Sequence, residues 1–268
     1  MNWFHELSSI GLAVFVLTLT LVLSVAGVWL VTPRVRASLL HRHFDNGSIA
    51  GLLSALIGVY AVAAGLTAVA VWQNMDDAAA DVGREAAAIA VLYQNLGGYP
   101  PLLEKQTKRA LAAYTRHVID HEWPMHLHGE LPPNTLRIIE AAQRAILAFE
   151  PASEGQKIVH ARVLEAYNRL VEAHWRRLQA VTDTALPIEL WVVVTLLGLS
   201  AISACFLLRV DSFQLHTALT LLVATPVALV IYFIAVSDHP FQGGISVSPE
   251  PYRAVYERLI LPDPAIQD

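Results

Sequence analysis

The sequence predicts an all-α membrane protein, with four transmembrane helices and a helical stalk bundle inserted between the second and third spans. Of its 268 residues, 55% are hydrophobic and only 15% are charged, whereas an average soluble domain has about 25% charged residues. Four long stretches contain no Asp, Glu, Lys or Arg. The segment between the second and third stretches has a near-soluble composition, and its apolar residues recur at helical spacing.

The charge-free stretches are the candidate membrane spans, and they cover residues 7–33, 46–75, 190–208 and 212–237. A helix needs about 20 residues to cross about 30 Å of hydrocarbon, and it is the open-chain structure that satisfies its own backbone in lipid. We therefore predict transmembrane helices 1 and 2 within residues 1–73, and helices 3 and 4 within residues 187–237. The first stretch follows no basic segment and is longer than the apolar part of a signal peptide, so we expect it to be retained.

Residues 74–186 are predicted to form an extramembrane bundle of four helices. The first continues the second span and carries one apolar stripe, formed by Val82, Ala86, Ile89, Tyr93 and Leu96. The other three helices are expected at about 102–123, 134–149 and 156–185, with a stop at Pro124 and an N-cap at Asn134. Residues 238–268 then form a separate C-terminal segment and tail.

Three charged residues occupy positions where these stripes predict apolar ones. They are Glu85, Glu122 and Arg177. A buried charge is costly unless it is paired, and the planar guanidinium of an arginine can serve two carboxylates. We expect Arg177 to bridge one or both acids in a buried polar cluster with a structural role. The alternative is that these positions lie at the edges of the stripes and are solvated.

A group of histidines offers a candidate metal site. His117 and His121 are four residues apart on one helical face, and His126 and His128 follow after Pro124. Histidines in this arrangement could bind a divalent metal of the zinc or nickel type. The alternative is a set of surface histidines at the end of a polar helix, and the chain contains no HExxH motif.

The second span has one narrow face of small residues, formed by Gly51, Ser54, Gly58, Ala61 and Gly65. Such a face can be a seam along which another helix packs closely. It can also line an ion path when copies of the helix surround an axis. The spans carry no acidic or basic residue, which disfavours proton relays and voltage sensors and suits a weakly hydrated anion better than a strongly hydrated cation.

Four motifs in order resemble the bestrophin-like domain-of-unknown-function family of bacterial and plant membrane proteins. The motifs are GREAAAIAVLY after the second span, Tyr114 with Glu122-Trp123-Pro124, RRLQAVTDTALPIELW leading into the third span, and DHPFQGGISVSPEPY after the fourth. The resemblance implies an oligomer, typically a pentamer, that conducts small inorganic anions along the second span. The sequence departs from bestrophins in one respect. Their second span has bulky apolar residues at the constriction, whereas the second span of this chain has Gly, Ser and Ala there.

The resemblance also implies a role for the stretch after the fourth span. Its residues Asp238, His239, Pro240, Phe241 and Gly243 would form a clamp beside the pore mouth. Pro240 would end the helix, and the glycine would let the backbone turn back. The alternative is a simple membrane-exit turn with an interfacial aromatic residue.

The preferred function is therefore an oligomeric, anion-conducting membrane channel. The alternative is a non-conducting membrane scaffold or sensor whose helical domain binds a ligand, a metal or a partner protein. We expect no enzyme and no cofactor beyond that metal, because no nucleophile with a base, no paired acids in a span and no nucleotide loop can be found. The net charge of −5 argues against nucleic acid as a partner, and the single Cys205 excludes a disulfide within one subunit.

The orientation in the membrane follows from the loop between the first two spans. Arg34, Arg36 and Arg42 place loop 32–47 on the cytoplasmic side of what we expect to be a bacterial inner membrane. Residues 74–186 and both termini would then be extracytoplasmic. The basic pair Arg176-Arg177 near the third span argues in the other direction.

Overall fold

The structure, a computed structural model, describes residues 9–37, 45–133, 137–243 and 245–267. Within these ranges every regular element is a helix, which confirms the all-α prediction. The principal helices are α1 (Ser9–Ala37), α2 (Asn46–Asn95), α3 (Pro101–His117), α4 (Trp123–His126), α5 (Arg137–Leu147), α6 (Glu154–Thr182), α7 (Ile188–Cys205), α8 (Phe213–Ser237), α9 (Glu250–Val255) and α10 (Pro264–Gln267). By length and composition, four helices of the described chain can cross a membrane: α1, α2, α7 and α8.

The chain divides into two compact units. The membrane unit comprises Met1–Asn74, Thr184–Asp238 and Gly243–Ile245, and the helical unit comprises Met75–Asp183, His239–Gln242 and Ser246–Asp268. The helix α2 contributes its first half to the membrane unit and its second half to the helical unit.

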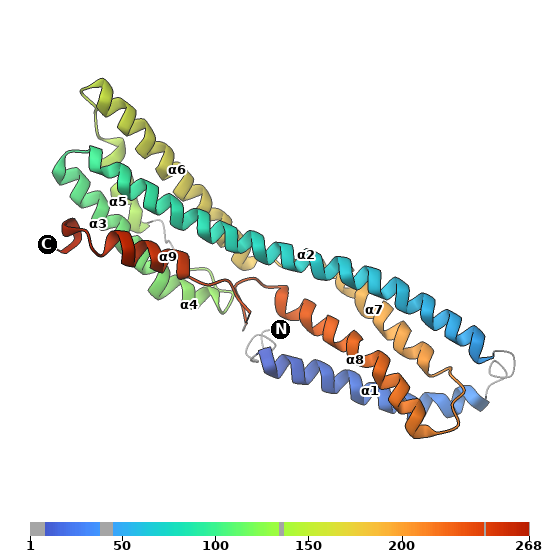
Figure 1. Cartoon of the computed structure of the whole chain (residues 1–268). Helices are drawn as coiled ribbons and strands as arrows, with labels where there is room; N and C mark the ends of the chain where they lie inside the picture. The colour runs from blue at the N-terminus through green and yellow to red at the C-terminus, as the bar shows by residue number, and fades with distance from the viewer. Residues whose placement is uncertain (1–8, 38–44, 134–136, 244, 268) are drawn as a thin grey trace. The chain divides into compact units, whose positions relative to one another are not determined.

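In the membrane unit, α8 packs against both α1 and α7 (Figure 1). Glycines allow two of the close approaches between helices. A Cβ atom at Gly27 of α1 would overlap the ring of Phe206, and one at Gly198 of α7 would lie 2.8 Å from Val227 Cγ1 on α8. Small residues at such points let helix backbones come close enough for dense packing in lipid.

The turn between α7 and α8 is held by polar side chains from three helices. The side chain of Asn46 donates to the Arg209 carbonyl at 3.0 Å and accepts from the Arg209 N–H at 2.9 Å. Arg36 donates to the Val210 carbonyl, and His216 Nε2 lies 2.9 Å from the Cys205 carbonyl oxygen. These bonds satisfy backbone groups that the ends of the two spans leave unpaired.

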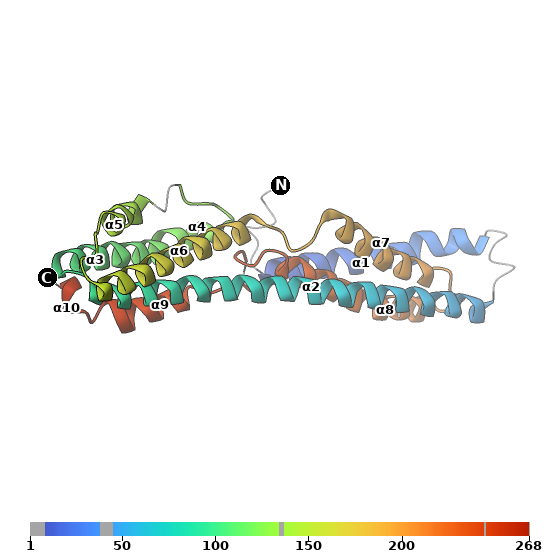
Figure 2. The same cartoon turned by 90° about the horizontal axis from the view of Figure 1, so that it is seen from above.

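In the helical unit, α3 and α6 run alongside the second half of α2 (Figure 2). Their predicted apolar stripes meet in one core, in which Val82, Ile89, Leu111, Val163 and Leu170 are at most 1% exposed. The start of α6 has a capping box, because the Ser153 hydroxyl accepts from the Gln156 N–H and the Gln156 side chain accepts from the Ser153 N–H. The predicted N-cap Asn134 lies outside the described residues.

The predicted stop at Pro124 is wrong. The chain passes from α3 through a π-helical turn (Val118–Glu122) directly into α4, so the backbone stays helical as far as His126. Proline is tolerated there because it follows the π turn, where the regular helical hydrogen bonds are already interrupted and its missing N–H costs little. The π turn supplies the preceding bond, in which the Trp123 N–H donates to the Val118 carbonyl.

The C-terminal segment is more than a tail, because it completes the core of the helical unit. After α9 comes a second π-helical turn (Tyr256–Ile260), and both Tyr252 and Ile260 are fully buried. Asp263 then accepts hydrogen bonds from Lys108 Nζ and the Tyr93 hydroxyl, both at 2.9 Å. These contacts fix α10 against α2 and α3.

Candidate functional site

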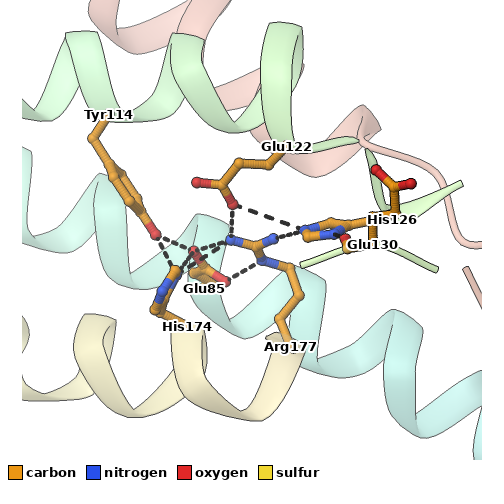
Figure 3. A network of polar contacts seen from close by, with 7 residues as sticks. All are labelled: Glu85, Tyr114, Glu122, His126, Glu130, His174 and Arg177. Carbon is orange, nitrogen blue, oxygen red and sulfur yellow. Dashed lines mark hydrogen bonds and ion pairs between the residues drawn. The ribbon is translucent and has the colours of Figure 1, made fainter. Parts of the chain in front are cut away.

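A buried cluster of charged residues lies in the core of the helical unit. Figure 3 shows the guanidinium of Arg177 between the carboxylates of Glu85 and Glu122. Arg177 Nε donates to Glu85 Oε2 at 2.8 Å, and Nη2 donates to Glu122 Oε2 at 2.7 Å. All three side chains are 0% exposed. The structure thus brings together the three charged residues that interrupt the apolar stripes.

Each member of the cluster is positioned by a different helical segment. Glu85 comes from α2, Arg177 from α6, and Glu122 from the π turn after α3. A π turn adds a residue to one turn of helix and so changes the direction in which the next side chains point. Glu122, at the end of this turn, faces the interior, as its place on the predicted stripe indicated.

Four further polar residues belong to the cluster, and the sequence did not predict their place in it. They are Tyr114, His126, His174 and Tyr252. The Tyr114 hydroxyl donates to Glu85 Oε1 and lies 3.0 Å from His174 Nδ1. His126 contacts Arg177 through Nε2, and the Tyr252 ring centroid is 5.9 Å from the Arg177 guanidinium carbon.

Burial and mutual attraction act in opposite directions on the charges of this cluster. Burial alone would raise the pKa of Glu85, but the charge of Arg177 and bonds from His174 and Arg177 hold that pKa well below its ordinary value. Burial would likewise lower the pKa of Arg177, and the carboxylate of Glu85 raises it well above the usual range. Both groups are therefore charged in the folded protein.

His126 responds in the opposite way. Burial, followed by the neighbouring charge of Arg177, lowers the pKa of His126 to about 4. Its Nδ1 lies 3.3 Å from the Glu130 carbonyl oxygen, and its Nε2 contacts Arg177 Nη1. A neutral imidazole that donates from Nδ1 and accepts at Nε2 satisfies both contacts.

The predicted clamp residues divide between the two units. In the membrane unit, Asp238 accepts from the Leu186 N–H at 3.0 Å and from the Trp191 indole N–H at 3.2 Å, and its carbonyl accepts from the Ala185 N–H at 3.0 Å. Asp238 thus ties the end of α8 to the start of α7. Gly243 has φ +80°, a conformation that glycine adopts without a steric penalty.

The remaining clamp residues belong to the helical unit. Phe241 is 1% exposed and packs edge-on against Trp123 and His126, with ring centroids at 5.6 and 5.9 Å. The Pro240 carbonyl accepts from the Val247 N–H at 2.8 Å, and the His239 carbonyl accepts from the Gln242 N–H at 3.2 Å. Through His126, the aromatic contacts of Phe241 reach the buried charge cluster.

The small-residue face of α2 is exposed along the membrane unit. Gly51, Ser54, Gly58, Ala61 and Gly65 are all exposed. A Cβ atom added at any of the three glycines would meet no other atom within 4 Å. No helix of the described chain therefore uses this face as a packing seam, and α2 instead packs through its opposite face.

The structure does not gather the four histidines at one place. The rings of His117 and His121 stack with their centroids 4.9 Å apart, while His126 is directed into the buried cluster and His128 Nδ1 bonds the Pro124 carbonyl at 2.8 Å. Among the described residues, no three metal-ligating side chains come together. The continuation of the helix through Pro124 separates side chains that a loop at this point could have gathered.

A family model described as the bestrophin-like domain matches residues 18–252. The chain belongs to the bestrophin-like family. Solved structures of a bestrophin homologue from Klebsiella pneumoniae are similar to it. One has a TM-score of 0.69 at 15% identity, covering 92% of this chain and 97% of that chain. A variant of that homologue has a TM-score of 0.71 at 15% identity, with coverages of 96% and 98%. No curated protein matches the sequence.

The bestrophin-like resemblance read from four motifs is thus confirmed at the level of family and fold. The polar partners of the cluster were harder to predict, although Tyr114 lies four residues before the apolar Val118 and His174 lies four residues after the apolar Leu170. The signal in the sequence that could have identified these two residues was a titratable side chain on an otherwise apolar stripe. Tyr252 gave no such signal, because its segment has no helical periodicity long enough to reveal a buried face.

Proposed function

We propose that copies of this chain assemble around an axis into a membrane channel, in which the small-residue face of α2 lines the path of small inorganic anions. The observation that carries the proposal is the exposure of this face over Gly51, Gly58 and Gly65, while the opposite face of α2 packs within its own chain through Tyr60 and Ala64. The family supports it, since bestrophins are oligomeric anion channels. A pentamer is the assembly that the resemblance implies.

The chemistry of the proposed path favours weakly hydrated anions. The face provides backbone groups and the Ser54 hydroxyl but no charged side chain. Such a path returns little of the hydration energy that a strongly hydrated cation loses, whereas a large anion loses less on entry. Chloride, bromide, nitrate and thiocyanate should therefore permeate more readily as their hydration weakens.

Flux from proteoliposomes loaded with these anions tests the proposal. Replacing Gly58 by Leu should reduce the flux by roughly tenfold or more, because every copy would add a leucine side chain to the path. Val59→Phe is the matched control, because this exposed neighbour points about 100° away around the helix. If Gly58→Leu leaves the flux unchanged, α2 does not line the pore. If no anion gives a flux, the chain does not form a channel.

The proposed orientation places the α7–α8 turn and the first loop in the cytoplasm. Arg34, Arg36 and Arg209 are exposed at this end of the membrane unit, and Arg42 lies outside the described residues. The excess of arginine on short loops supports a cytoplasmic location. The helical unit would then be extracytoplasmic.

A non-conducting scaffold or sensor is the second candidate. It is favoured by a groove of about 330 Å³ between α2 and α6 of the helical unit. Ala87, Ala88 and Val91 belong to its lining, together with Arg84 and Arg176. A protein that binds a partner through this unit but gives no flux for any anion would fit this function.

A further inference from the structure

A groove of about 400 Å³ runs along the membrane unit between α1 and α7. Figure 1 shows α8 between these two helices, and α8 packs against both. On α1 the lining of this α1–α7 groove includes Leu19 and Leu23, and on α7 it includes Leu199 and Phe206. The buried Val227 of α8 belongs to the floor. Because all three helices are candidate spans, the groove lies at the level of the hydrocarbon.

The size of the α1–α7 groove fits one hydrocarbon chain better than a helix. Its lining on α7 extends from Thr195 to Phe206, a length of about 16 Å at 1.5 Å per residue. The volume divided by this length gives a mean cross-section of about 25 Å². A helix with a diameter of about 10 Å has a cross-section of about 80 Å². A helix of another subunit could not enter the groove, whereas an acyl chain, which is one methylene group wide, could.

An arginine continues the groove face of α1 toward the end of the span. Arg34 follows the lining residue Val16 by 18 residues, which is five full helical turns, and α1 stays helical as far as Ala37. Arg34 is exposed, and its Nη1 donates to the Leu30 carbonyl. This bond uses one of the five N–H donors of the guanidinium. The other donors suit a phosphate group, which arginine binds through parallel hydrogen bonds.

The turn between α7 and α8 closes the same end of the groove. The Thr32 hydroxyl donates to the Phe206 carbonyl at 3.4 Å, and Arg36 donates to the Val210 carbonyl. Arg209 is exposed in this turn. Among the described residues, three arginines at this end exceed the two exposed acids, which are Asp45 and Asp211. The end of the groove therefore has an excess of positive charge.

We propose that the α1–α7 groove binds an anionic phospholipid, with one acyl chain along the two helices and the phosphate on Arg34. Lipid tails are as apolar as the lining of the groove, so the chain alone gains little by leaving the bilayer. Preference for one lipid must therefore come from the headgroup. Basic residues beside a gap between spans are an arrangement that binds anionic headgroups. The inference does not depend on channel activity.

The unfolding midpoint of the full-length protein in a nonionic detergent tests the headgroup. Dioleoyl phosphatidylglycerol and dioleoyl phosphatidylcholine have the same chains and differ in net charge. At saturation the first should raise the midpoint by roughly 5 °C and the second by less than about 2 °C. sn-Glycerol 3-phosphate, which has no acyl chain, should not raise it. Equal shifts with the two lipids, or the full shift with glycerol phosphate, would overturn the proposal.

Two substitutions test the location of the site. Arg34→Gln should reduce the phosphatidylglycerol shift to that of phosphatidylcholine, whereas Arg116→Gln, at an exposed arginine of the helical unit, should keep the full shift. Ser203→Phe should abolish the shift, because Ser203 is an exposed part of the lining and the added ring would fill the groove. Ser200→Phe is the matched control on the same helix, outside the lining. A full shift in Arg34→Gln or in Ser203→Phe would overturn the proposal.

A second measurement covers the case in which Ser203→Phe does not fold. Native mass spectrometry of the wild-type protein, equilibrated with equal amounts of the two lipids, should show roughly fivefold more bound phosphatidylglycerol than phosphatidylcholine. Arg34→Gln should bind the two lipids equally. Equal binding by the wild type, or an unchanged preference in Arg34→Gln, would exclude the site.

Discussion

Arg177 is the residue on which the core of the helical unit most depends. It gives hydrogen bonds to two carboxylates on different helical segments and contacts an imidazole on a third. Breaking a buried pair by removing one partner leaves the other charge unpaired, which is more costly than the pair itself is stabilising. The neighbouring Arg176 offers a contrast, because its bond to Glu172 lies on the surface.

Replacing Arg177 by Met should therefore lower the free energy of unfolding by about 3–5 kcal/mol, because Glu85 and Glu122 would both lose their counter-charge. Arg176→Met should change it by less than about 1 kcal/mol, since exposed pairs contribute little. Thermal or denaturant unfolding of the purified protein in detergent measures both. Equal losses in the free energy of unfolding at the two positions would show that the cluster contributes no more to stability than a surface pair.

The carboxylate of Glu85 predicts a loss of stability in acid. Because its pKa is lowered in the folded state, its contribution is present above the unfolded value of about 4.3 and is lost as the pH falls through the folded value. The midpoint temperature of unfolding should thus fall once the pH is lowered below about 4. Glu85→Gln should be less stable at neutral pH and should show a smaller drop in acid, whereas an unchanged acid profile would contradict this role.

At the scale of the elements, one acidic residue ties the end of the C-terminal segment to α2 and α3. Asp263 accepts from Lys108 and Tyr93, and the bonds of Lys108 and the Ala265 N–H hold the pKa of Asp263 below its usual value. Asp263→Asn should lower the free energy of unfolding by about 1 kcal/mol and increase proteolysis after α9. Glu257→Gln, at an exposed acid of the same segment, is the control and should change neither.

The packing of α7 against α8 gives a prediction in the membrane unit. Gly198 faces Val227, and any Cβ at this position would come within 2.8 Å of its side chain. Gly198→Leu should therefore destabilise the unit by about 1–3 kcal/mol through overpacking. Gly51→Leu, on the open face of α2, is the matched control, and it should leave unfolding nearly unchanged in the isolated chain.

Most of these elements could be predicted from apolar periodicity, for physical reasons. The spans are long and uncharged, and stripes such as Val82 to Leu96 have the helical repeat. The π turn could not be predicted, because an α and a π turn have the same local composition. The burial of Tyr252 could not be predicted either, since short helices stabilised by tertiary contacts have no repeat of their own.

At the scale of the whole molecule, the structure has four candidate spans and the chain belongs to the bestrophin-like family. The orientation of the chain in the membrane can be measured. The single Cys205 is buried, and its thiol donates to the Ala201 carbonyl at 3.6 Å, a bond that a serine hydroxyl can replace. Cys205→Ser should therefore provide a functional background without thiols. New cysteines can then report which side of the membrane each exposed segment faces.

In that background, Ala152→Cys of the helical unit should react with a membrane-impermeant thiol reagent in intact cells. Asp211→Cys, in the turn between α7 and α8, should react only after the membrane is permeabilised. Both positions are exposed in the single chain. The opposite pattern would invert the proposed orientation and would place the helical unit in the cytoplasm.

The π turn at Val118–Glu122 has a consequence for how this chain can change in length. A π turn is an α-helix with one residue to spare, so deleting a residue such as Asp120 would restore a regular helix instead of breaking it. The shortened helix would still form, and because the residues of a π turn cover about the rotation of one fewer residue in an α-helix, the side chains beyond the deletion would keep their directions. Glu122 and His126 would therefore stay in the interior together, and the shorter chain would keep both groups that hold Arg177 from this side.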